Sequence, residues 1–401
     1  MGDGVGSDWL EPGEVASLTA HDLLARVNEL LPLVASRAAW AELHRRPDDE
    51  VMAAMRRAGL YYHFVPKRFG GLELSVPAFV DEVLPLAGVC ASTAWVTSFC
   101  MEHNLILSLF PEQAQTEIFG AQPYIVAPAA GFPFGHAAPV PGGFRVSGRW
   151  SYASGVMHAD WAMGTVIVEG SDPIDVRWVV VPISDVEVHD VWRVDGMSGT
   201  GSNDMSMDDV FVPEHRALDA VAAGDGAAPG ARIHENPMYR MPLLTFLALT
   251  AALPIVGAAR GAQRLLAERV ATRVSFGVPQ AERATVQAVL GDVTVAVDVA
   301  EMIVRSAAVE IVALAATGRS DDVPARAAIR ARLTHATTTC RAAVRSMLDA
   351  AGSSAHDLSQ PLQRIARDVA MASTHVIHDP LTTSEVYGRV ILGLPPQTPM
   401  I

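Results

Sequence analysis

Apolar residues recur every three to four positions through the first 120 residues, and this spacing predicts helices. In residues 14–43, Leu23, Val27 and Val34 fall on one face, as expected for one or two helices that pack on a core. Acidic residues after Pro47 and a serine at Ser75 mark further helix starts. We therefore expect helices at 14–43, 48–58, 75–86 and 92–109.

The pattern changes near residue 123. Up to residue 212, short runs rich in β-branched and apolar residues alternate with Gly, Pro and Asp, which predicts a mostly antiparallel β unit. Residues 218–230 are rich in alanine and glycine, and they predict a mobile surface loop. The expected strands are 124–127, 144–147, 162–168, 176–181 and 205–212.

Long alanine-rich segments follow from residue 237, and they suit a four-helix bundle because alanine allows close packing. The expected bundle helices are 241–266, 286–317, 323–351 and 360–376. The chain therefore reads as an α+β protein in three domains. These are an N-terminal helical domain (1–122), a central antiparallel β domain (123–225) and a C-terminal four-helix bundle (226–401).

Residues 241–259 raise the question of a membrane span, because they are apolar and close to the length that crosses a bilayer. The segment contains Pro242 and Pro254 and lacks a tryptophan or tyrosine belt on both sides. The helices after it are amphipathic, as expected if they wrap around it. We predict a buried central helix and no membrane partner.

Charge and cysteine usage narrow the classes of function. The chain has 401 residues, half of them hydrophobic, and a formal net charge of −14, whereas a nucleic-acid groove needs a basic stripe. Cys90, Cys100 and Cys340 show no metal-ligand spacing and are expected to be reduced. The first twelve residues lack a basic start and an apolar signal core. We expect a cytoplasmic protein that acts on a small molecule, without metal or nucleic acid.

The stretch from 149 to 161 carries the densest candidate chemistry. It places two serines, a glycine and a histidine between Trp150 and Trp161. Gly155 lets a backbone approach a ligand closely, and the Ser154 hydroxyl could meet the polar edge of a planar cofactor. The alternative is a strand–turn–strand segment whose tryptophans belong to the core.

Four landmarks, in this order, resemble the acyl-CoA dehydrogenase superfamily over nearly the whole chain. The resemblance implies the fold of that superfamily: helical domain, β domain and four-helix bundle. The landmarks are Gly59-Leu60 with Phe69-Gly70-Gly71, then Gly199-Thr200-Gly201-Ser202 with Phe211-Val212-Pro213, then Arg273-Val274-Ser275-Phe276-Gly277, and last Arg364-Ile365-Ala366-Arg367-Asp368.

A missing carboxylate points to one branch of that superfamily. Its dehydrogenases abstract a proton with a glutamate on the final helix, and Val376 holds that position here. The other placement is on the first bundle helix, yet residues 236–267 contain no carboxylate. The chain instead resembles the reduced-flavin-dependent monooxygenases, such as the oxygenase component of p-hydroxyphenylacetate hydroxylase, the steroid phenol hydroxylase and the aminosugar N-oxygenases. The residues that match their pattern are Trp150, Ser154, Gly155, His158 and Trp161.

This resemblance implies three catalytic residues. Ser154 would lie near flavin N5, His375 on the final helix would face the C4a region, and His103 would contact a phenolic substrate. His158 is expected to be structural, and His378 to cap the last helix. The cofactor-binding residues that the resemblance implies are Trp150, Ser154, Gly155, His158, Thr200, Gly201, Ser202 and Arg273.

Two of these assignments concern the cofactor phosphate and the oligomer. Thr200, Gly201 and Ser202 would offer hydroxyl and backbone groups, and Arg273 would offer a guanidinium fork. In the family that arginine reaches a flavin held by a neighbouring subunit, so the resemblance implies a homotetramer. Each residue also has a plain structural alternative, as a hairpin turn or a surface arginine.

The favoured function is that of a flavin-dependent monooxygenase that hydroxylates an aromatic or amine small molecule. It would use externally supplied reduced flavin, FMN or FAD, and O2 through a C4a-hydroperoxide. Because the sequence has no nicotinamide-binding motif, a separate flavin reductase is expected. The alternatives are an acyl-CoA or acyl-carrier-protein dehydrogenase with a relocated base, and a non-catalytic scaffold without flavin.

Overall fold

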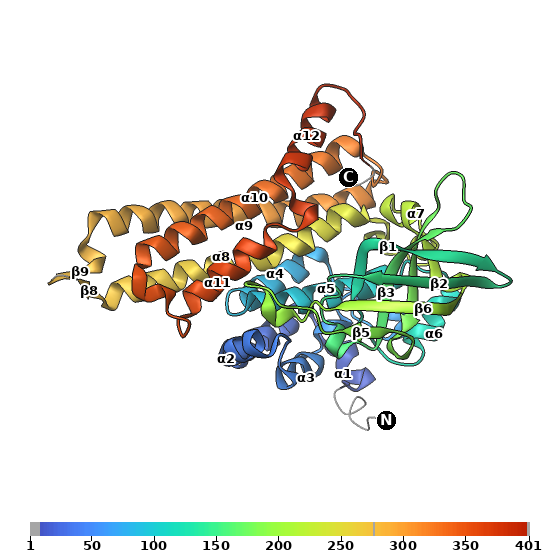
Figure 1. The fold of residues 1–401 in the computed structure, drawn as a ribbon, viewed down its shortest axis with the longest axis horizontal. Helices are drawn as coiled ribbons and strands as arrows, with labels where there is room; N and C mark the ends of the chain where they lie inside the picture. The colour runs from blue at the N-terminus through green and yellow to red at the C-terminus, as the bar shows by residue number, and fades with distance from the viewer. Residues whose placement is uncertain (1–8, 276, 399–401) are drawn as a thin grey trace.

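The structure is a computed structural model that describes residues 9–275 and 277–398. Figure 1 shows three parts: N-terminal helices, a β unit beside them, and a long helix bundle that extends away from the β unit. The order of these parts along the chain is the predicted one, so the α+β architecture is confirmed.

Capping side chains set the ends of the N-terminal helices where the sequence predicted them. The Asp48 carboxylate accepts the N–H groups of Glu50 and Val51, and the left-handed Gly59 ends the same helix. Ser75 accepts the N–H of Ala78 at the next helix start. The helices are α1 (Pro12–Ser17), α2 (Ala20–His44), α3 (Asp49–Ala58), α4 (Val76–Ala87), α5 (Ala91–Leu107) and the unpredicted α6 (Glu112–Phe119).

The β unit is one seven-stranded sheet in the order β5-β6-β2-β1-β3-β4-β7. Neighbouring strands are antiparallel except β1 and β3, which run parallel. The sheet is therefore mostly antiparallel, as predicted, with one parallel pair that makes it mixed. The strands are β1 (Ala129–Val140), β2 (Gly143–Trp150), β3 (Trp161–Val168), β4 (Val176–Pro182), β5 (Glu187–His189), β6 (Asp204–Pro213) and β7 (Ala217–Asp219).

The first predicted strand, 124–127, is wrong, because this segment is buried but forms no ladder. The strand that does form, β1, begins at Ala129 and contains Pro133 and two glycines, which hide the alternating pattern. The four other predicted strands correspond to β2, β3, β4 and β6.

Trp150 fills the middle of the sheet. Its side chain is fully buried, and its indole N–H donates to the Thr165 carbonyl at 2.8 Å. A Cβ at Gly135, Gly148 or Gly164 would lie within 3.0 Å of the indole ring, so these glycines leave the space that the ring occupies.

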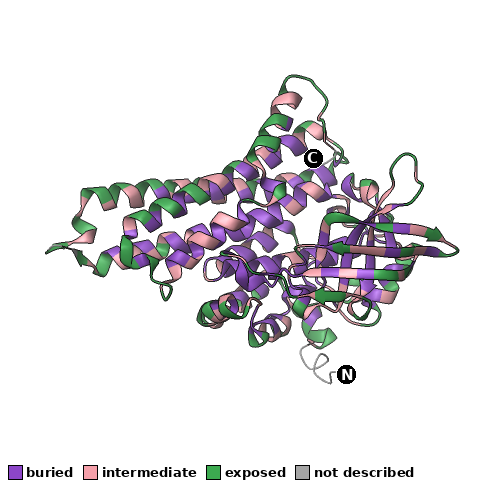
Figure 2. Ribbon diagram, viewed as in Figure 1, coloured by how far each residue is buried: buried purple, intermediate pink, exposed green. Residues whose placement is uncertain are grey.

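The bundle is built around α8 (Leu243–Thr272), which packs against α9 (Ala284–Ala316) and α10 (Val323–Ala351). Helix α8 is long and apolar enough to cross a bilayer, but 83% of its most apolar window is buried inside the fold. Figure 2 shows this burial along α8, while α9 exposes one side. The predicted buried central helix is therefore present.

The end of the bundle differs from the prediction. Helix α11 (Pro361–Ala372) is shorter than the expected 360–376, and the turn η12 (Val376–His378) follows it. An unpredicted helix, α12 (Pro380–Ile391), begins after Asp379, whose carboxylate accepts the Thr382 N–H. At the other end of the bundle, the strands β8 (Val274–Ser275) and β9 (Val278–Pro279) form a small hairpin (Figure 1).

The segment 218–230 was predicted as a surface loop, but it is partly helical and packs against its neighbours. It contains the short helix α7 (Ala220–Gly224), and Ala223 and Ala228 are buried. A Cβ at Gly230 would lie 1.9 Å from the Ser108 carbonyl oxygen, and Asp225 forms an ion pair of 2.9 Å with Arg326. Small residues here allow close packing.

Candidate active site

Helix α5 presents an aromatic stripe formed by Trp95, Phe99 and His103. The three residues are four positions apart and therefore lie above one another on the helix. The centroid of the Phe99 ring lies 4.9 Å from that of Trp95 and 5.8 Å from that of His103. Trp95 and His103 are buried, while Phe99 is half-buried.

The turn between β2 and β3 is pressed against this stripe. Gly155 has a φ of +81°, and a Cβ there would lie 2.9 Å from Val96 Cγ1 on α5. Only glycine meets both demands without strain. The Gly155 N–H donates to the Thr200 carbonyl at 3.3 Å. This close approach brings the neighbouring Ser154 next to Trp95.

A chain of hydrogen bonds runs from Trp95 through three hydroxyl groups to a backbone carbonyl. The Trp95 Nε1–H donates to Ser154 Oγ at 3.2 Å. Ser154 Oγ lies 2.7 Å from Ser202 Oγ, which lies 2.6 Å from Thr200 Oγ1. Thr200 Oγ1 donates to the Met197 carbonyl at 2.8 Å. Ser202 and Thr200 are buried, whereas Ser154 is half-buried.

His375 approaches the same indole from the bundle. Its ring centroid lies 5.6 Å from that of Trp95, and the residue is half-buried. It does not lie on the final helix, as predicted, but in the turn between α11 and η12, where its Nδ1 accepts the Ile377 N–H at 3.3 Å. The remaining proton of a neutral ring is therefore on Nε2. Burial lowers the pKa of His375 to about 4, so the ring is neutral near pH 7.

Helix α11 also holds the turn that carries Thr200 and Ser202. The buried Asp368 carboxylate accepts the Met197 N–H at 2.6 Å. At the other end of the turn, Asn203 Oδ1 accepts the N–H groups of Val191 and Trp192 at 3.0 Å each. The turn contains η6 (Ser198–Thr200). The Asp368 bond ties this turn to α11, the helix that precedes His375, while the Asn203 bonds tie it to residues 191–192.

His103 presents the opposite ring tautomer from His375. Its Nδ1 bonds to the Ala127 carbonyl, and because a carbonyl only accepts, Nδ1 carries the proton and Nε2 a lone pair. Burial lowers the pKa of His103 to about 4. Glu102, the preceding residue, is fully buried, and its carboxyl oxygens have no hydrogen-bond partner among the described residues.

Comparison with known proteins gives the relatives of this chain. Residues 249–380 match the family model described as "Acyl-CoA dehydrogenase, C-terminal domain". The chain is 37% identical to a "Pigment production hydroxylase" from a Rhodococcus strain, over 96% of this chain and all of that protein. It is 32% identical to the "FADH(2)-dependent resorcinol hydroxylase, oxygenase component" from a Rhizobium strain, over 94% of this chain and 95% of the relative.

Two solved structures share the whole fold. The HsaA monooxygenase from Mycobacterium tuberculosis superposes with a TM-score of 0.91 at 33% identity, covering 96% of this chain and all of the other. The chain belongs to the flavin-dependent monooxygenases of the acyl-CoA dehydrogenase superfamily. XiaF from a Streptomyces strain, solved with FADH2 and glycerol, gives a TM-score of 0.88 at 30% identity, covering 97% of this chain and 99% of the other.

Within this family, the chain is the oxygenase component of a two-component monooxygenase, and its cofactor is reduced flavin. A component of this kind implies a separate reductase and a small-molecule substrate. The dehydrogenase and flavin-free alternatives are therefore set aside. The position expected for a dehydrogenase base is Val376, whose side chain is apolar and more than half exposed.

The groups around Trp95 fit a reduced flavin monooxygenase site. The ring system of a flavin is planar, with a polar edge of ring nitrogens and carbonyls, and it needs apolar walls with a few neutral hydrogen-bonding groups. Ser154, a neutral His375 and the indole of Trp95 supply that set. When bound, reduced flavin supplies the electrons for oxygen activation, and these three residues are the ones that would hold its reacting end.

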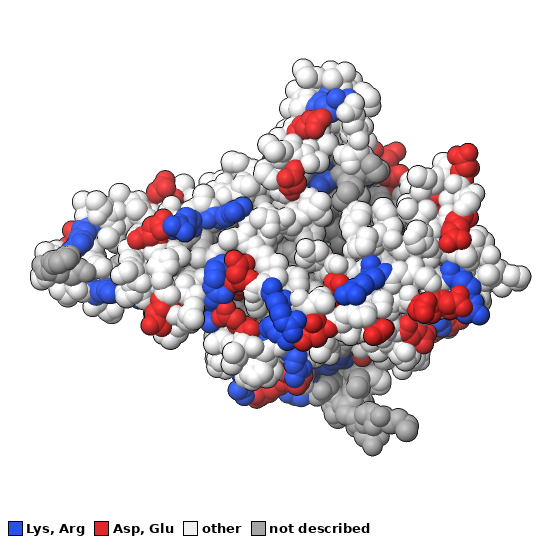
Figure 3. All heavy atoms as spheres, in the orientation of Figure 1, with Lys and Arg blue, Asp and Glu red and all other residues white. Residues whose placement is uncertain are grey.

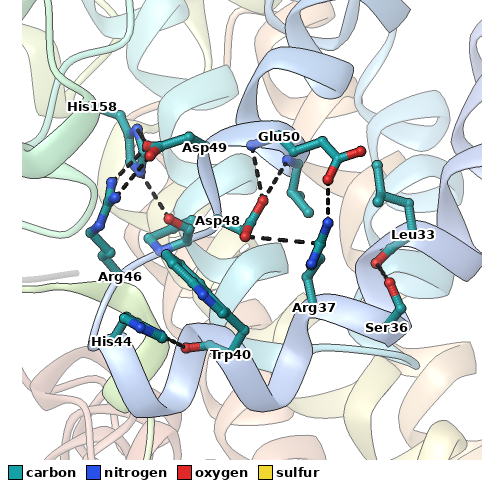
Figure 4. A network of polar contacts seen from close by, with 12 residues as sticks. Leu33, Ser36, Arg37, Trp40, His44, Arg46, Asp48, Asp49, Glu50 and His158 are labelled. Atoms are coloured by element: carbon teal, nitrogen blue, oxygen red, sulfur yellow. Dashed lines mark hydrogen bonds and ion pairs between the residues drawn. The ribbon is translucent and has the colours of Figure 1, made fainter.

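Two predicted cofactor residues lie away from this set. Trp150 is enclosed in the core of the sheet. This agrees with the alternative interpretation of the sequence, in which the tryptophans of this segment belong to the core. His158 lies in η4 (Val156–His158), where its Nε2 bonds to the Pro47 carbonyl at 3.1 Å and its Nδ1 lies 3.6 Å from Asp49. Figure 4 shows His158 beside Arg46 and Asp49 in a network that joins the β unit to the N-terminal helices. This placement agrees with the structural role expected for it.

The residues predicted for the phosphate are also dispersed. The hydroxyls of Thr200 and Ser202 take part in the chain of hydrogen bonds behind Ser154. A Cβ at Gly201 would lie 2.9 Å from the Arg45 carbonyl oxygen, so the backbone at Gly201 is packed against the end of α2. Arg273 directly precedes the β8–β9 hairpin, at the end of the bundle away from the sheet (Figure 1). Phe276, from the same sequence landmark, lies outside the described residues.

The sequence missed Trp95, Asp368 in its anchoring role, and Glu102. Trp95 starts a run of aromatic residues four apart, which could have marked it, but the same spacing is common in cores. His378 was expected to cap a helix, and instead it is fully buried, with both ring nitrogens unpartnered among the described residues. No local sequence pattern predicts that the imidazole of His378 is buried without a hydrogen-bond partner among the described residues.

Proposed function

We propose that this oxygenase component hydroxylates the ring of a phenol-type aromatic substrate and uses FADH2 as its reduced flavin. The observation that carries the proposal is that Ser154 and His375, from different parts of the chain, both contact Trp95. The resorcinol hydroxylase relative and the FADH2 complex of XiaF support the aromatic substrate and the FAD form.

The two histidines suit a phenol because they present complementary hydrogen-bonding groups. His375 keeps a proton on Nε2 and donates, while His103 keeps a lone pair on Nε2 and accepts. A substrate hydroxyl can donate to His103, which orients the ring that it belongs to. The His375 N–H can donate to oxygen at the position of attack. Phe99 lies between Trp95 and His103 in the stripe and offers an apolar ring surface.

Exclusion of water is the other task of these residues. Reduced flavin and oxygen give hydrogen peroxide when the reaction leaks, so a productive site must be dry. The largely buried α5 stripe and α8, which packs against α5, supply apolar surface near the half-buried Ser154 and His375. The low pKa of both histidines keeps formal charge out of this region near pH 7.

The test is direct mixing of the protein with photoreduced FAD, oxygen and a panel of phenols and amines. We expect a hydroxylated phenol, with product accounting for most of the oxygen consumed. His103→Ala should lower the fraction of oxygen that ends in product more for a phenol than for its O-methyl ether. Hydroxylation of amines but not phenols would contradict the proposed substrate class.

We also propose a homotetramer whose subunits share cofactor sites. Arg273 lies at the end of the bundle away from Ser154, so its guanidinium serves a flavin only if that flavin belongs to another subunit (Figure 1). Helix α9 offers an apolar outer face for such contacts. The large apolar residues exposed on this helix are Val295, Val299, Met302 and Val309.

A further inference from the structure

The direction of the hydrogen-bond chain behind Ser154 can be worked out by counting protons. The chain begins at the Trp95 indole N–H, which can only donate, and ends at the Met197 carbonyl, which can only accept. Each hydroxyl between them has one hydrogen. If every contact is a hydrogen bond, each hydroxyl must donate toward Met197.

Each step of the count uses one contact of the chain. Thr200 gives its hydrogen to the Met197 carbonyl, so across the 2.6 Å contact it must accept from Ser202. Ser202 then has no hydrogen left for Ser154, so across the 2.7 Å contact it must accept. Ser154 therefore donates inward to Ser202 and receives the Trp95 N–H. The hydroxyl of Ser154 keeps one lone pair for a ligand and no hydrogen.

We infer that Ser202 and Thr200 are positioning residues that hold Ser154 as a hydrogen-bond acceptor, and that this makes the site select reduced over oxidised flavin. The inference rests on the proposed placement of Ser154 beside flavin N5. It gives Thr200 and Ser202 a role other than phosphate binding, in keeping with their burial behind Ser154.

The selectivity follows from the chemistry of N5. In reduced flavin N5 carries a hydrogen and donates, whereas in oxidised flavin N5 has only a lone pair and accepts. A serine fixed as an acceptor can accept a hydrogen bond from N5 of the reduced form. Against the oxidised form, a lone pair of the serine oxygen would face the lone pair of N5, which is unfavourable. In a two-component system this difference favours release of the oxidised flavin, which must return to the reductase.

The experiment measures the dissociation constants of photoreduced and oxidised FAD by anaerobic titration calorimetry. In Ser202→Ala the Ser154 hydrogen loses its inward acceptor and can turn toward the ligand. We expect oxidised FAD to bind more tightly, so that the ratio of oxidised to reduced dissociation constants falls about three- to tenfold. Thr200→Val should lower the ratio in the same direction, because Ser202 is then free to reverse.

Ser198→Ala is the matched control. Ser198 lies in the same turn and is buried, but its hydroxyl donates to the Val194 carbonyl at 2.8 Å. It therefore takes no part in the hydrogen-bond chain from Trp95 to Met197. Its ratio should equal that of the wild type. The double variant Ser154→Ala/Ser202→Ala should match Ser154→Ala alone, since Ser202 acts only through Ser154.

The outcomes separate two kinds of failure. If Ser154→Ala leaves the ratio unchanged, Ser154 is not beside N5, and both its proposed placement and this inference fall. Suppose that Ser154→Ala lowers the ratio but Ser202→Ala does not, or that Ser202→Ala lowers it by the same factor with and without Ser154→Ala. In either case the proposed placement of Ser154 stands, and the fixed direction of the hydrogen bonds is overturned. Near-ultraviolet circular dichroism of each variant checks that the native packing is retained.

Discussion

Glu102 is an acidic side chain that the fold keeps fully buried beside the active-site stripe. Burial raises its pKa to about 8, against the smaller opposite effect of the nearby Thr250 hydroxyl. The carboxyl is therefore mostly protonated near pH 7 and adds no charge next to His103. Because the folded state holds this proton more tightly than the unfolded state, its contribution to stability is complete below about pH 4.5 and is lost as the pH rises toward 8.

We predict that Glu102→Gln removes this part of the pH dependence. The free energy of unfolding of the wild type should fall relative to the variant by up to about 1.4 kcal/mol for each pH unit between 5 and 8. Urea denaturation of both proteins at pH 5, 6, 7 and 8 measures the difference. Equal slopes would mean that Glu102 is ionised in the folded protein.

A second prediction at the residue scale concerns His375. The amide nitrogen of glutamine can occupy a position near His Nε2, whereas that of asparagine lies nearer Nδ1. His375→Asn should therefore lower the fraction of oxygen that ends in product about tenfold or more, while His375→Gln should retain more of it. Product and hydrogen peroxide are measured together. Equal losses in both variants would contradict a donor role for Nε2.

At the scale of elements, the β2–β3 turn and helix α5 form one unit because Gly155 allows them to touch. Gly155→Ala should lower the free energy of unfolding more than Gly142→Ala. Both glycines have a positive φ, but a Cβ at Gly155 would meet Val96 at 2.9 Å, whereas no described atom lies within 4 Å of a Cβ at Gly142. We expect about 1 kcal/mol for Gly142→Ala and about 2–4 kcal/mol for Gly155→Ala. Similar losses would show that backbone strain alone matters.

The sequence predicted elements well where the boundary signal was local. Asp48, Gly59 and Ser75 mark helix ends through their own side chains or φ angles, and the structure confirms them. Strand β1 was missed because its glycines and Pro133 break the alternating pattern, and pairing with β2 and β3 decides its conformation.

The candidate site was predictable only in part for the same reason. Motif resemblance picked out Ser154 and His375, and the structure brings both to Trp95. The hydroxyl chain joins residues 95, 154, 200 and 202, which come from three separate parts of the sequence. Its direction depends on a carbonyl that only the folded turn places there, so no local pattern could have indicated it.

At the scale of the whole molecule, the outer face of α9 exposes large apolar side chains that a single subunit does not cover. Val295, Met302 and Val309 are each more than half exposed along one face of this helix. Charges of both signs mostly lie next to one another on the face drawn in Figure 3. An apolar helix face of this kind suits contact with another subunit.

We predict that Met302→Glu combined with Val309→Glu shifts the protein to smaller assemblies. Burying two carboxylates in an apolar interface costs several kcal/mol, which is enough to dissociate a moderate contact. Light scattering after size exclusion measures the mass. Ile174→Glu, at a residue 71% exposed in the β unit, is the matched control and should leave the mass unchanged. A monomeric wild type would contradict the proposed tetramer.

The contact of Trp95 with both Ser154 and His375 makes this indole a built-in optical probe. An isoalloxazine absorbs where tryptophan emits, so a flavin bound here should quench Trp95 fluorescence strongly. The chain has seven tryptophans, and Trp95→Phe would show how much of the quenching comes from this one. Flavin exchange between the reductase and the oxygenase could then be followed in real time without any label.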